Sequence, residues 1–412
     1  MSPDTHMPQA GPDMGAAGPF SGLRVLDLTS HIAGPYCTKL FADYGADVVK
    51  IERPVVGDGA RLTPPFFRDE PDLEGSLLFQ YLNTNKKSVT LDLKRERGVA
   101  IALDLVRDVD VVVESFRPGT LDRLGLGFGQ LQAVNPKVVL TSISNFGQTG
   151  PYRDLRASEL VLYAMGGIMA ISGRSDREPL KHGLAQAQYG AGAVAAYATA
   201  CAVLAQMAGV PGQWVDVSIQ ETLASELIVN EPTYAWAGGI QGRRPPSGDG
   251  LNNIMASKDG YVVLQFAAAS TWSSVAELLD HPPLADPKFA TAAGRARHAE
   301  ELDSAIAMRL AQMGKWELFE RAHQHRLLSG VAQEPADLYA CPQLEGRDYF
   351  VDVDHPRSGT LRHPGAPVLM SETPWTLRHR APLLGEHTPE VLAERANVTA
   401  SEFEELRRDA LC

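Results

Sequence analysis

The sequence contains little cysteine. Its 412 residues include four cysteines, and no two of them form a CxxC pair: Cys37, Cys201, Cys341 and Cys412. A disulfide framework and a cysteine-based zinc site both require closely spaced cysteines, so both are disfavoured. The signatures of serine hydrolases (GxSxG), zinc peptidases (HExxH) and P-loop nucleotide binding are also absent. We therefore expect a reduced, cytoplasmic protein without a metal site.

Positive charge is also scarce. The chain has 38 Lys and Arg residues against 50 Asp and Glu residues, which gives a net charge of −12. Nucleic-acid binding requires an extended basic field, so a nucleic-acid partner is disfavoured. A local basic pocket is still compatible with this charge. Arg53, Arg117 and Arg123 follow predicted strands, and Lys86 and Lys87 precede one, which favours a polyanionic small molecule near the strand ends.

Only one uncharged run is long enough to cross a membrane. It covers residues 187–209, is dominated by Ala and Gly, and contains Gln188 and Gln206. This composition favours a buried helix, so we predict no membrane association. The first residues, 1–20, have no apolar signal sequence and are predicted to be a flexible tail.

The pattern of the first third of the chain is typical of an α/β fold. Apolar, β-branched runs predict strands at 23–29, 47–52, 88–93, 109–114 and 138–144, and helical spacings lie between them. Strands that are apolar throughout indicate a parallel sheet covered on both faces. The most loop-like segment is 238–253, which is rich in Gly, Pro and Asp.

The loop after the first strand is the natural place for an anion. It reads SHIAGP and leads into a helix, whose N-terminal N–H groups attract negative charge. It does not match GxGxxG, so the usual dinucleotide fingerprint is missing. His31 in this loop is compatible with a packing or capping role as well as with a catalytic one.

Six segments together resemble one known family. They are SGLRVLDLTSHIAGPYCTKLFADYGADVVKIERP (21–54), NTNKKSVTLDL (83–93), DVVVESFRPGTLDRLGLG (110–127), NPKVVLTSISNFGQTGPY (135–152), GQWVDVSIQET (212–222) and APLLGEHTPEVL (381–392). In this order they resemble the family III CoA-transferases, also called the CaiB/BaiF family. The resemblance implies a Rossmann-like large domain built from both chain ends, a smaller middle domain, and two subunits interlocked like rings.

This resemblance implies domain boundaries and substrates. The large domain would comprise 21–205 and 336–412, and the small domain with its linkers 206–335. Acyl-CoA and a carboxylic acid would be the substrates, with no tightly bound cofactor. The positions that match the family's CoA contacts are Ser30, Ala33, Arg53, Leu91, Ser115, Phe116, Arg123 and Arg156. Two positions depart from the family pattern: Ser115 replaces a frequent Asn, and Ile32 replaces a Gln of some members.

The family's catalytic carboxylate is missing. Family members carry an Asp just before the long small-residue helix, and the matching residue here is Gln188. An amide cannot replace a carboxylate nucleophile, and such a loss typically lowers the rate ~10⁴–10⁶-fold. A racemase is disfavoured as well, because its His and Asp match Ser158 and Gln188 and two-base proton transfer needs two titratable groups.

Three hypotheses follow from Gln188. In the first, this chain is a subunit of a hetero-oligomer, as in the succinyl-CoA:benzylsuccinate type, and a homologous subunit supplies the Asp. In the second, the chain forms a homo-oligomer and Glu159 acts as the nucleophile, although Glu159 is equally suited to cap a helix or pair with an Arg. In the third, the chain binds acyl-CoA without catalysis.

Overall fold

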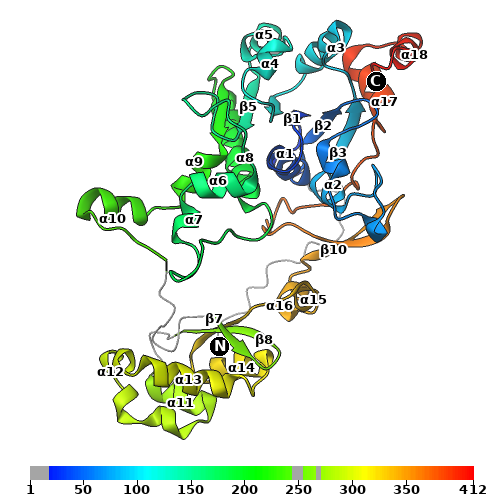
Figure 1. Cartoon of the computed structure of the whole chain (residues 1–412). Helices are drawn as coiled ribbons and strands as arrows, with labels where there is room; N and C mark the ends of the chain where they lie inside the picture. The colour runs from blue at the N-terminus through cyan, green and yellow to red at the C-terminus, as the bar shows by residue number, and fades with distance from the viewer. Residues whose placement is uncertain (1–17, 244–253, 266–270) are drawn as a thin grey trace. The chain divides into compact units, whose positions relative to one another are not determined.

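A computed structural model describes residues 18–243, 254–265 and 271–412 (Figure 1). The predicted tail at 1–20 and the loop at 238–253 lie largely outside the described residues. The described residues divide into two compact units. The first comprises those up to Ala170 together with Leu180–Gln241 and Tyr349–Cys412. The second comprises Ile171–Pro179 and the described part of Gly242–Asp348.

The first unit is built on a six-stranded sheet with the order β3-β2-β1-β4-β5-β6. All neighbouring strands are parallel, so the predicted α/β class with a parallel sheet is confirmed. The strands are β1 (Arg24–Leu28), β2 (Asp47–Glu52), β3 (Lys86–Thr90), β4 (Val111–Glu114), β5 (Val139–Ser144) and β6 (Trp214–Ser218). The strand β6 falls in the range expected for the small domain, yet it pairs with β5 in this sheet.

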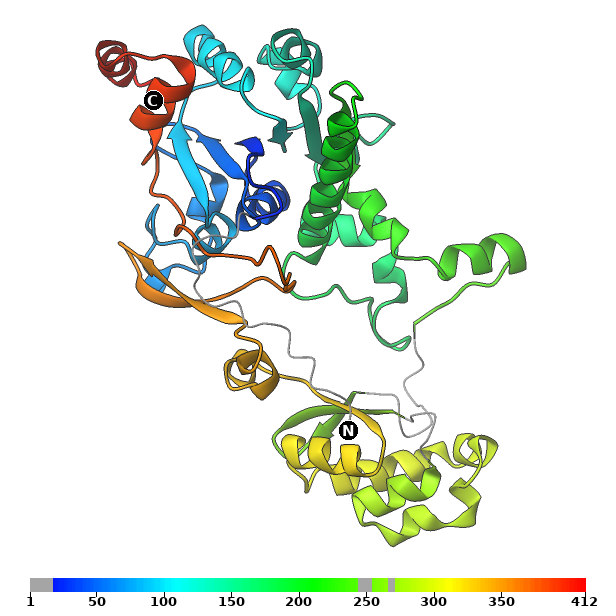
Figure 2. The same ribbon diagram turned by 180° about the vertical axis from the view of Figure 1, so that it is seen from behind.

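Successive strand residues point to opposite sides, and the strands place apolar residues on both, so both faces of the sheet are apolar. Helices cover each face. On one face, α1 (Ala33–Asp43), α6 (Glu159–Met165), α8 (Gln186–Met207) and α9 (Ile219–Ser225) share a core with Val25 and Val111. On the other, α3 (Glu96–Val106), α5 (Phe128–Val134), α17 (Thr388–Ala396) and α18 (Ala400–Arg408) share a core with Leu26 and Val112. The C-terminal helices therefore complete a layer begun near the N-terminus, with α17 beside α3 (Figure 2).

The long helix α8 contains most of the uncharged run noted in the sequence. Among the described residues it is the single helix with the length and composition to cross a membrane. Its buried side includes Ala191, Ala195 and Thr199 and contacts α1, β5, β6 and α9, which accounts for the small uncharged residues on that side. Gly192 lies at the crossing with α1, where a Cβ atom would come within 2.5 Å of the carbonyl oxygen of Ala33.

Shorter elements complete the first unit. They are the 3₁₀ turns η1 (Gly59–Leu62) and η2 (Phe67–Asp69), the helices α2 (Leu77–Leu82), α4 (Thr120–Arg123), α7 (Ile168–Ile171) and α10 (Asn230–Ala237), and the hairpin strands β10 (Phe350–His355) and β11 (Gly359–Pro364). The helix α7 ends at the first residue of the second unit.

The second unit is a small antiparallel sheet with helices and its own core. Its strands are β7 (Ile254–Ser257), β8 (Gly260–Gln265) and β9 (Leu328–Val331), in that order. Its helices are α11 (Trp272–Leu279), η3 (Pro282–Ala285), η4 (Pro287–Phe289), α12 (Ala292–Arg297), α13 (Ala299–Leu310), α14 (Lys315–Gln324), α15 (Pro335–Tyr339) and α16 (Pro342–Glu345). Leu264, Leu278 and Leu302 are fully buried in this core.

Candidate functional site

A cavity of about 660 Å³ lies at the carboxyl ends of β1, β4 and β5. The chain leaves β1 toward β2 and β3 on one side and returns to β4 on the other, so the loops after β1 and β4 diverge. Open α/β sheets bind ligands at such a switch point, because the diverging loops leave a crevice there. The first residues of α6 and α8 complete the lining with Glu159 and Gln188.

Most residues that the sequence assigns to CoA or to catalysis line this one cavity. They are Ser30, Ala33, Ser115, Phe116, Arg123, Arg156, Glu159 and Gln188. Two others lie elsewhere. Arg53 is exposed directly after the end of β2, and Leu91 is buried in the core between the sheet and the helices α3 and α17. For Arg53 and Leu91 a role in CoA binding therefore stays a prediction from the resemblance alone.

The loops after β1 and β4 are joined by a hydrogen bond. The backbone N–H of Ser30 donates to Oγ of Ser115 at 3.0 Å. Ser115 stands where the family often has Asn, and its hydroxyl accepts from the neighbouring loop. This bond links two residues that are 85 positions apart and fixes the spacing of two cavity walls.

Four arginines make the cavity lining locally positive in an acidic chain: Arg117, Arg123, Arg153 and Arg156. Arg123 donates to Oγ1 of Thr120 at 2.8 Å, and Arg153 forms an exposed ion pair with Asp154 at 3.4 Å. Guanidinium groups bind phosphate oxygens in a bidentate manner, so this lining suits a polyanion. Sequence reasoning missed Arg153, although it follows directly on the NFGQTGPY motif.

The carboxyl group of Glu159 lies at the first turn of α8, the helix that also carries Gln188. Oε1 of Glu159 accepts a hydrogen bond from the backbone N–H of Ala187 at 2.8 Å, while its Oε2 is buried and has no hydrogen-bond partner among the described residues. Gln188 is half-buried, and within the described residues no hydrogen bond of its side-chain amide is found.

Sequence reasoning did not identify the carboxyl group of Glu114, the last residue of β4. Glu114 is buried, and its Oε2 accepts from the N–H of Phe116 at 2.7 Å. Burial raises the pKa of Glu114 to about 7, and hydrogen bonds from Ser142 and Phe116 oppose this rise only in part. The signal in the sequence is a Glu at the end of an apolar strand, directly before SFRPG.

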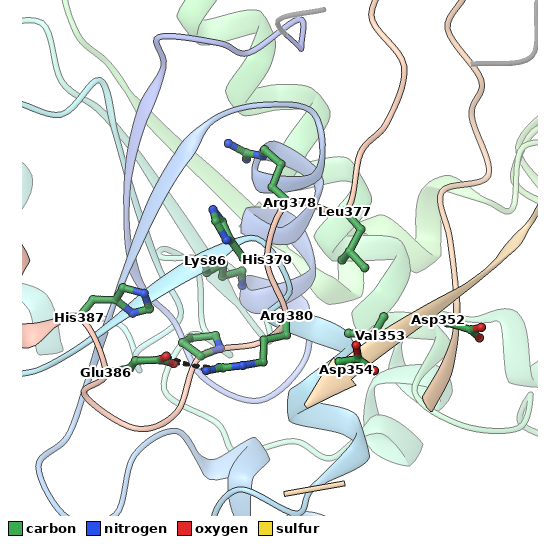
Figure 3. Close-up of a pocket in the computed structure, with 11 residues that line it drawn as sticks. Lys86, Asp352, Val353, Asp354, Leu377, Arg378, His379, Arg380, Glu386 and His387 are labelled. Carbon is green, nitrogen blue, oxygen red and sulfur yellow. Dashed lines mark hydrogen bonds and ion pairs between the residues drawn. The ribbon is translucent and has the colours of Figure 1, made fainter. Parts of the chain in front are cut away.

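A second cavity, of about 360 Å³, lies between β10 and residues 377–387 (Figure 3). Its arginines already have protein partners. Arg380 forms two hydrogen bonds with Glu386, at 2.9 and 2.7 Å, and Arg378 donates to the carbonyl oxygens of Ala42 and Ala46. Lys86 lines it, but none of the residues matched to the family's CoA contacts or nucleophile does. The cavity at the switch point is therefore the candidate site.

Curated proteins of similar sequence are CoA-transferases of varied substrates. A succinate–glutarate CoA-transferase from Agrobacterium fabrum is 32% identical over 95% of this chain and 97% of its own length. A succinyl-CoA–D-citramalate CoA-transferase from Chloroflexus aurantiacus is 33% identical over 93% of this chain and 96% of its own length. A formyl-CoA:oxalate CoA-transferase from Streptomyces avermitilis is 34% identical over 90% and 94%. The acids in these names differ from one relative to the next.

A solved structure agrees with the sequence comparisons. A CaiB/BaiF family protein from Brucella suis superposes with a TM-score of 0.83 and 29% identity, over 92% of this chain and 99% of that one. The family model for CoA-transferase family III matches residues 20–388. The resemblance found in the sequence motifs is thereby confirmed: the chain belongs to CoA-transferase family III.

Proposed function

We propose that this chain binds acyl-CoA in the switch-point cavity and serves as the subunit without a nucleophile in a two-chain CoA-transferase. Family III membership makes the chain a CoA-transferase, with CoA thioesters and carboxylates as its substrate classes. The observation that carries the proposal is Gln188. Its amide lines the cavity at the position where, by resemblance, the family carries its catalytic Asp.

The chemistry needs a carboxylate at this position. A carboxylate oxygen attacks the thioester carbonyl, the C–S bond breaks, and a mixed anhydride and a CoA thiolate result. The thiolate then attacks the enzyme-side carbonyl of the anhydride, which gives an enzyme thioester and releases the donor acid. The acceptor carboxylate attacks this thioester and displaces the thiolate, which then attacks the acceptor-side carbonyl, so that the acceptor leaves as its CoA thioester and the enzyme carboxylate is restored. The lone pair of an amide nitrogen is delocalised into its carbonyl group, so Gln188 cannot start this sequence. In our proposal the Asp of a homologous subunit does so.

Glu159 supports a second candidate, a homo-oligomeric transferase. Its carboxyl group lines the same cavity, and no hydrogen bond from the described residues restrains the buried Oε2. The other oxygen is held by the N–H of Ala187 at the N-terminus of α8. That hydrogen bond occupies a lone pair of the carboxyl group and lowers its nucleophilicity, which is why we favour the first candidate.

The assembly is part of the proposal. We propose that the chain interlocks with a homologous subunit, or with a second copy of itself, in the cytoplasm. Large apolar side chains on the outer sides of α8 and α10 are exposed in the isolated chain, among them Tyr197, Leu204, Tyr234 and Trp236. Exposed apolar surface of this kind is typical of a subunit interface.

The decisive variant is Gln188→Asp. We expect the wild-type chain alone to transfer CoA from succinyl-CoA to a panel of carboxylic acids at background rate. The variant should raise the rate by roughly 10²-fold or more, which is part of the ~10⁴–10⁶-fold cost of losing a nucleophile. Formation of the new CoA thioester, followed by liquid chromatography, measures it. Gln186→Asp is the matched control, because Gln186 is exposed on the same helical turn and does not line the cavity.

Other outcomes separate the alternatives. Turnover by the wild-type chain alone that Glu159→Gln abolishes would contradict the two-chain proposal and favour Glu159 as nucleophile. If CoA binds but the wild type, Gln188→Asp and the chain co-expressed with a homologous subunit all fail to transfer it, the third hypothesis, a non-catalytic acyl-CoA-binding protein, would hold instead.

A further inference from the structure

The loop that follows β1 rests on a buried carboxylate from another part of the chain. Asp58 lies just before η1 and is 4% exposed. Its Oδ1 accepts three hydrogen bonds, from Oγ of Ser30 at 2.7 Å and from the backbone N–H groups of His31 and Ala60, each at 2.8 Å. Ser30 and His31 line the candidate cavity, whereas Asp58 does not. Asp58 therefore touches the site only through this loop.

A buried lysine fixes the charge of Asp58. Nζ of Lys50 lies 2.8 Å from Oδ2 of Asp58 and donates to the carbonyl oxygen of Thr29 at 2.8 Å. Burial alone would raise the pKa of Asp58, but Lys50 and the backbone N–H donors outweigh it and lower that pKa. Lys50 is also 3.8 Å from Asp27, so its charge is balanced from two sides. The carboxylate is thus held ionised, with its acceptor oxygen directed at the loop.

The loop adopts a backbone conformation that needs such support. His31 has φ of 68°, in the left-handed region, which is strained for a residue other than glycine. The segment that carries Asp58 also packs on it: the N–H of Gly59 donates to Oγ of Ser30 at 3.2 Å, and a Cβ atom on Gly59 would come within 2.4 Å of Cε1 of His31. A side chain at position 59 would therefore make the imidazole ring of His31 move.

We propose that Asp58, paired with Lys50, is a positioning residue that holds Ser30 and His31 in the conformation that receives acyl-CoA. The inference rests on the proposed function, because it takes the switch-point cavity as the CoA site. The Ser30 N–H bond to Ser115 carries the same constraint to the loop after β4. Disturbing Asp58 therefore moves two walls of the cavity at once.

The test is a double-mutant cycle read by calorimetric titration of CoA into the full-length chain. Asp58→Asn removes the charge and turns an N–H group toward either Ser30 or Lys50, so we expect CoA affinity to fall about tenfold or more. Ser30→Ala should lower affinity less. Added to Asp58→Asn, it should cost clearly less than it costs alone, because part of the effect of Asp58 passes through the Ser30 hydroxyl group.

A matched control separates positioning from general stability. Asp43 is also buried, pairs with Lys39 at 2.9 Å, and accepts from Asn85 at 2.8 Å, but it lies at the far end of α1 from the cavity. Asp43→Asn should lower the melting temperature about as much as Asp58→Asn and leave CoA affinity unchanged. If Asp58→Asn does not fold, Gly59→Ala takes its place, since its methyl group displaces His31 without touching the ion pair.

The possible results are distinct. If wild type binds CoA and either Asp58→Asn or Gly59→Ala binds it equally well, the positioning role is overturned and the CoA site stands. If the fold-losses in CoA affinity of the two single variants simply multiply in the double variant, the positioning role would also be overturned. If the wild-type chain does not bind CoA at all, the proposed site itself fails, and the positioning role fails with it.

Discussion

Glu114 is a buried carboxyl group whose protonation links pH to stability. Burial raises its pKa from the usual 4.5 to about 7, with Asp216 and Asp122 adding to the effect. The folded chain therefore binds a proton more tightly than the unfolded chain does. By linkage, the stability that this proton provides is present below about pH 4.5 and is lost as pH rises to about 7 and beyond.

Glu114→Gln tests this linkage. The amide keeps an acceptor oxygen for the N–H of Phe116 but cannot ionise, so the variant should lose less stability than wild type between pH 5 and 8. The difference in unfolding free energy between wild type and Glu114→Gln should change by on the order of 1–3 kcal/mol over that range. Denaturant unfolding at a series of pH values measures it. Parallel curves for the two proteins would show that Glu114 does not titrate in this window.

At the scale of elements, α8 places Gln188 at the cavity and crosses α1 closely at Gly192. Gly192→Ala places a methyl group 2.5 Å from the carbonyl oxygen of Ala33, so α1 and α8 must move apart. We expect a loss of about 1–3 kcal/mol in unfolding free energy, even though Ala favours helix more than Gly does.

Gly190 offers the matched control on the same helix. A Cβ atom there would have its nearest neighbours at 3.8 Å, in Glu226 and Thr222. Gly190→Ala should therefore stabilise the chain by about 0.5–1 kcal/mol through helix propensity alone. Thermal or denaturant unfolding of both variants gives the comparison, and equal effects of the same sign would rule out the steric account of the crossing.

At the scale of the whole molecule, the first unit is closed by its C-terminal helices. Leu392 on α17 is fully buried in the core that includes Leu26 and Ile101. Leu392→Ala should cost about 2–5 kcal/mol, the range for a large apolar side chain removed from a packed core. Glu394→Ala, exposed on the same helix, should be nearly neutral. A small loss for Leu392→Ala would mean that α17 is not part of the cooperative unit.

The strands and the family could be predicted from the sequence because their signals are local. Apolar β-branched runs predicted the strands of the sheet to within a few residues, since strand formation and burial depend on neighbouring side chains. The third strand begins two residues earlier than expected, at Lys86. Its ammonium group is buried and lies 2.8 Å from Thr38 and 3.2 Å from Asp27. A lysine that the sequence pattern places on the surface is therefore inside the protein.

The site could be predicted only in part. The resemblance named Ser30, Ser115 and Gln188, because each lies in a recognisable motif. It did not name Asp58 or Glu114, because what these carboxylates do depends on where the chain folds back upon itself.

The sequence by itself determined the α/β class, the family and the absence of an Asp at position 188, all of which are written in short stretches of chain. Only the tertiary structure decided that β6 joins the large sheet and that Asp58 supports Ser30. It alone also decided that Thr90 donates its N–H to Thr388, 298 positions away. Such contacts depend on the path of the entire chain, which no local pattern encodes.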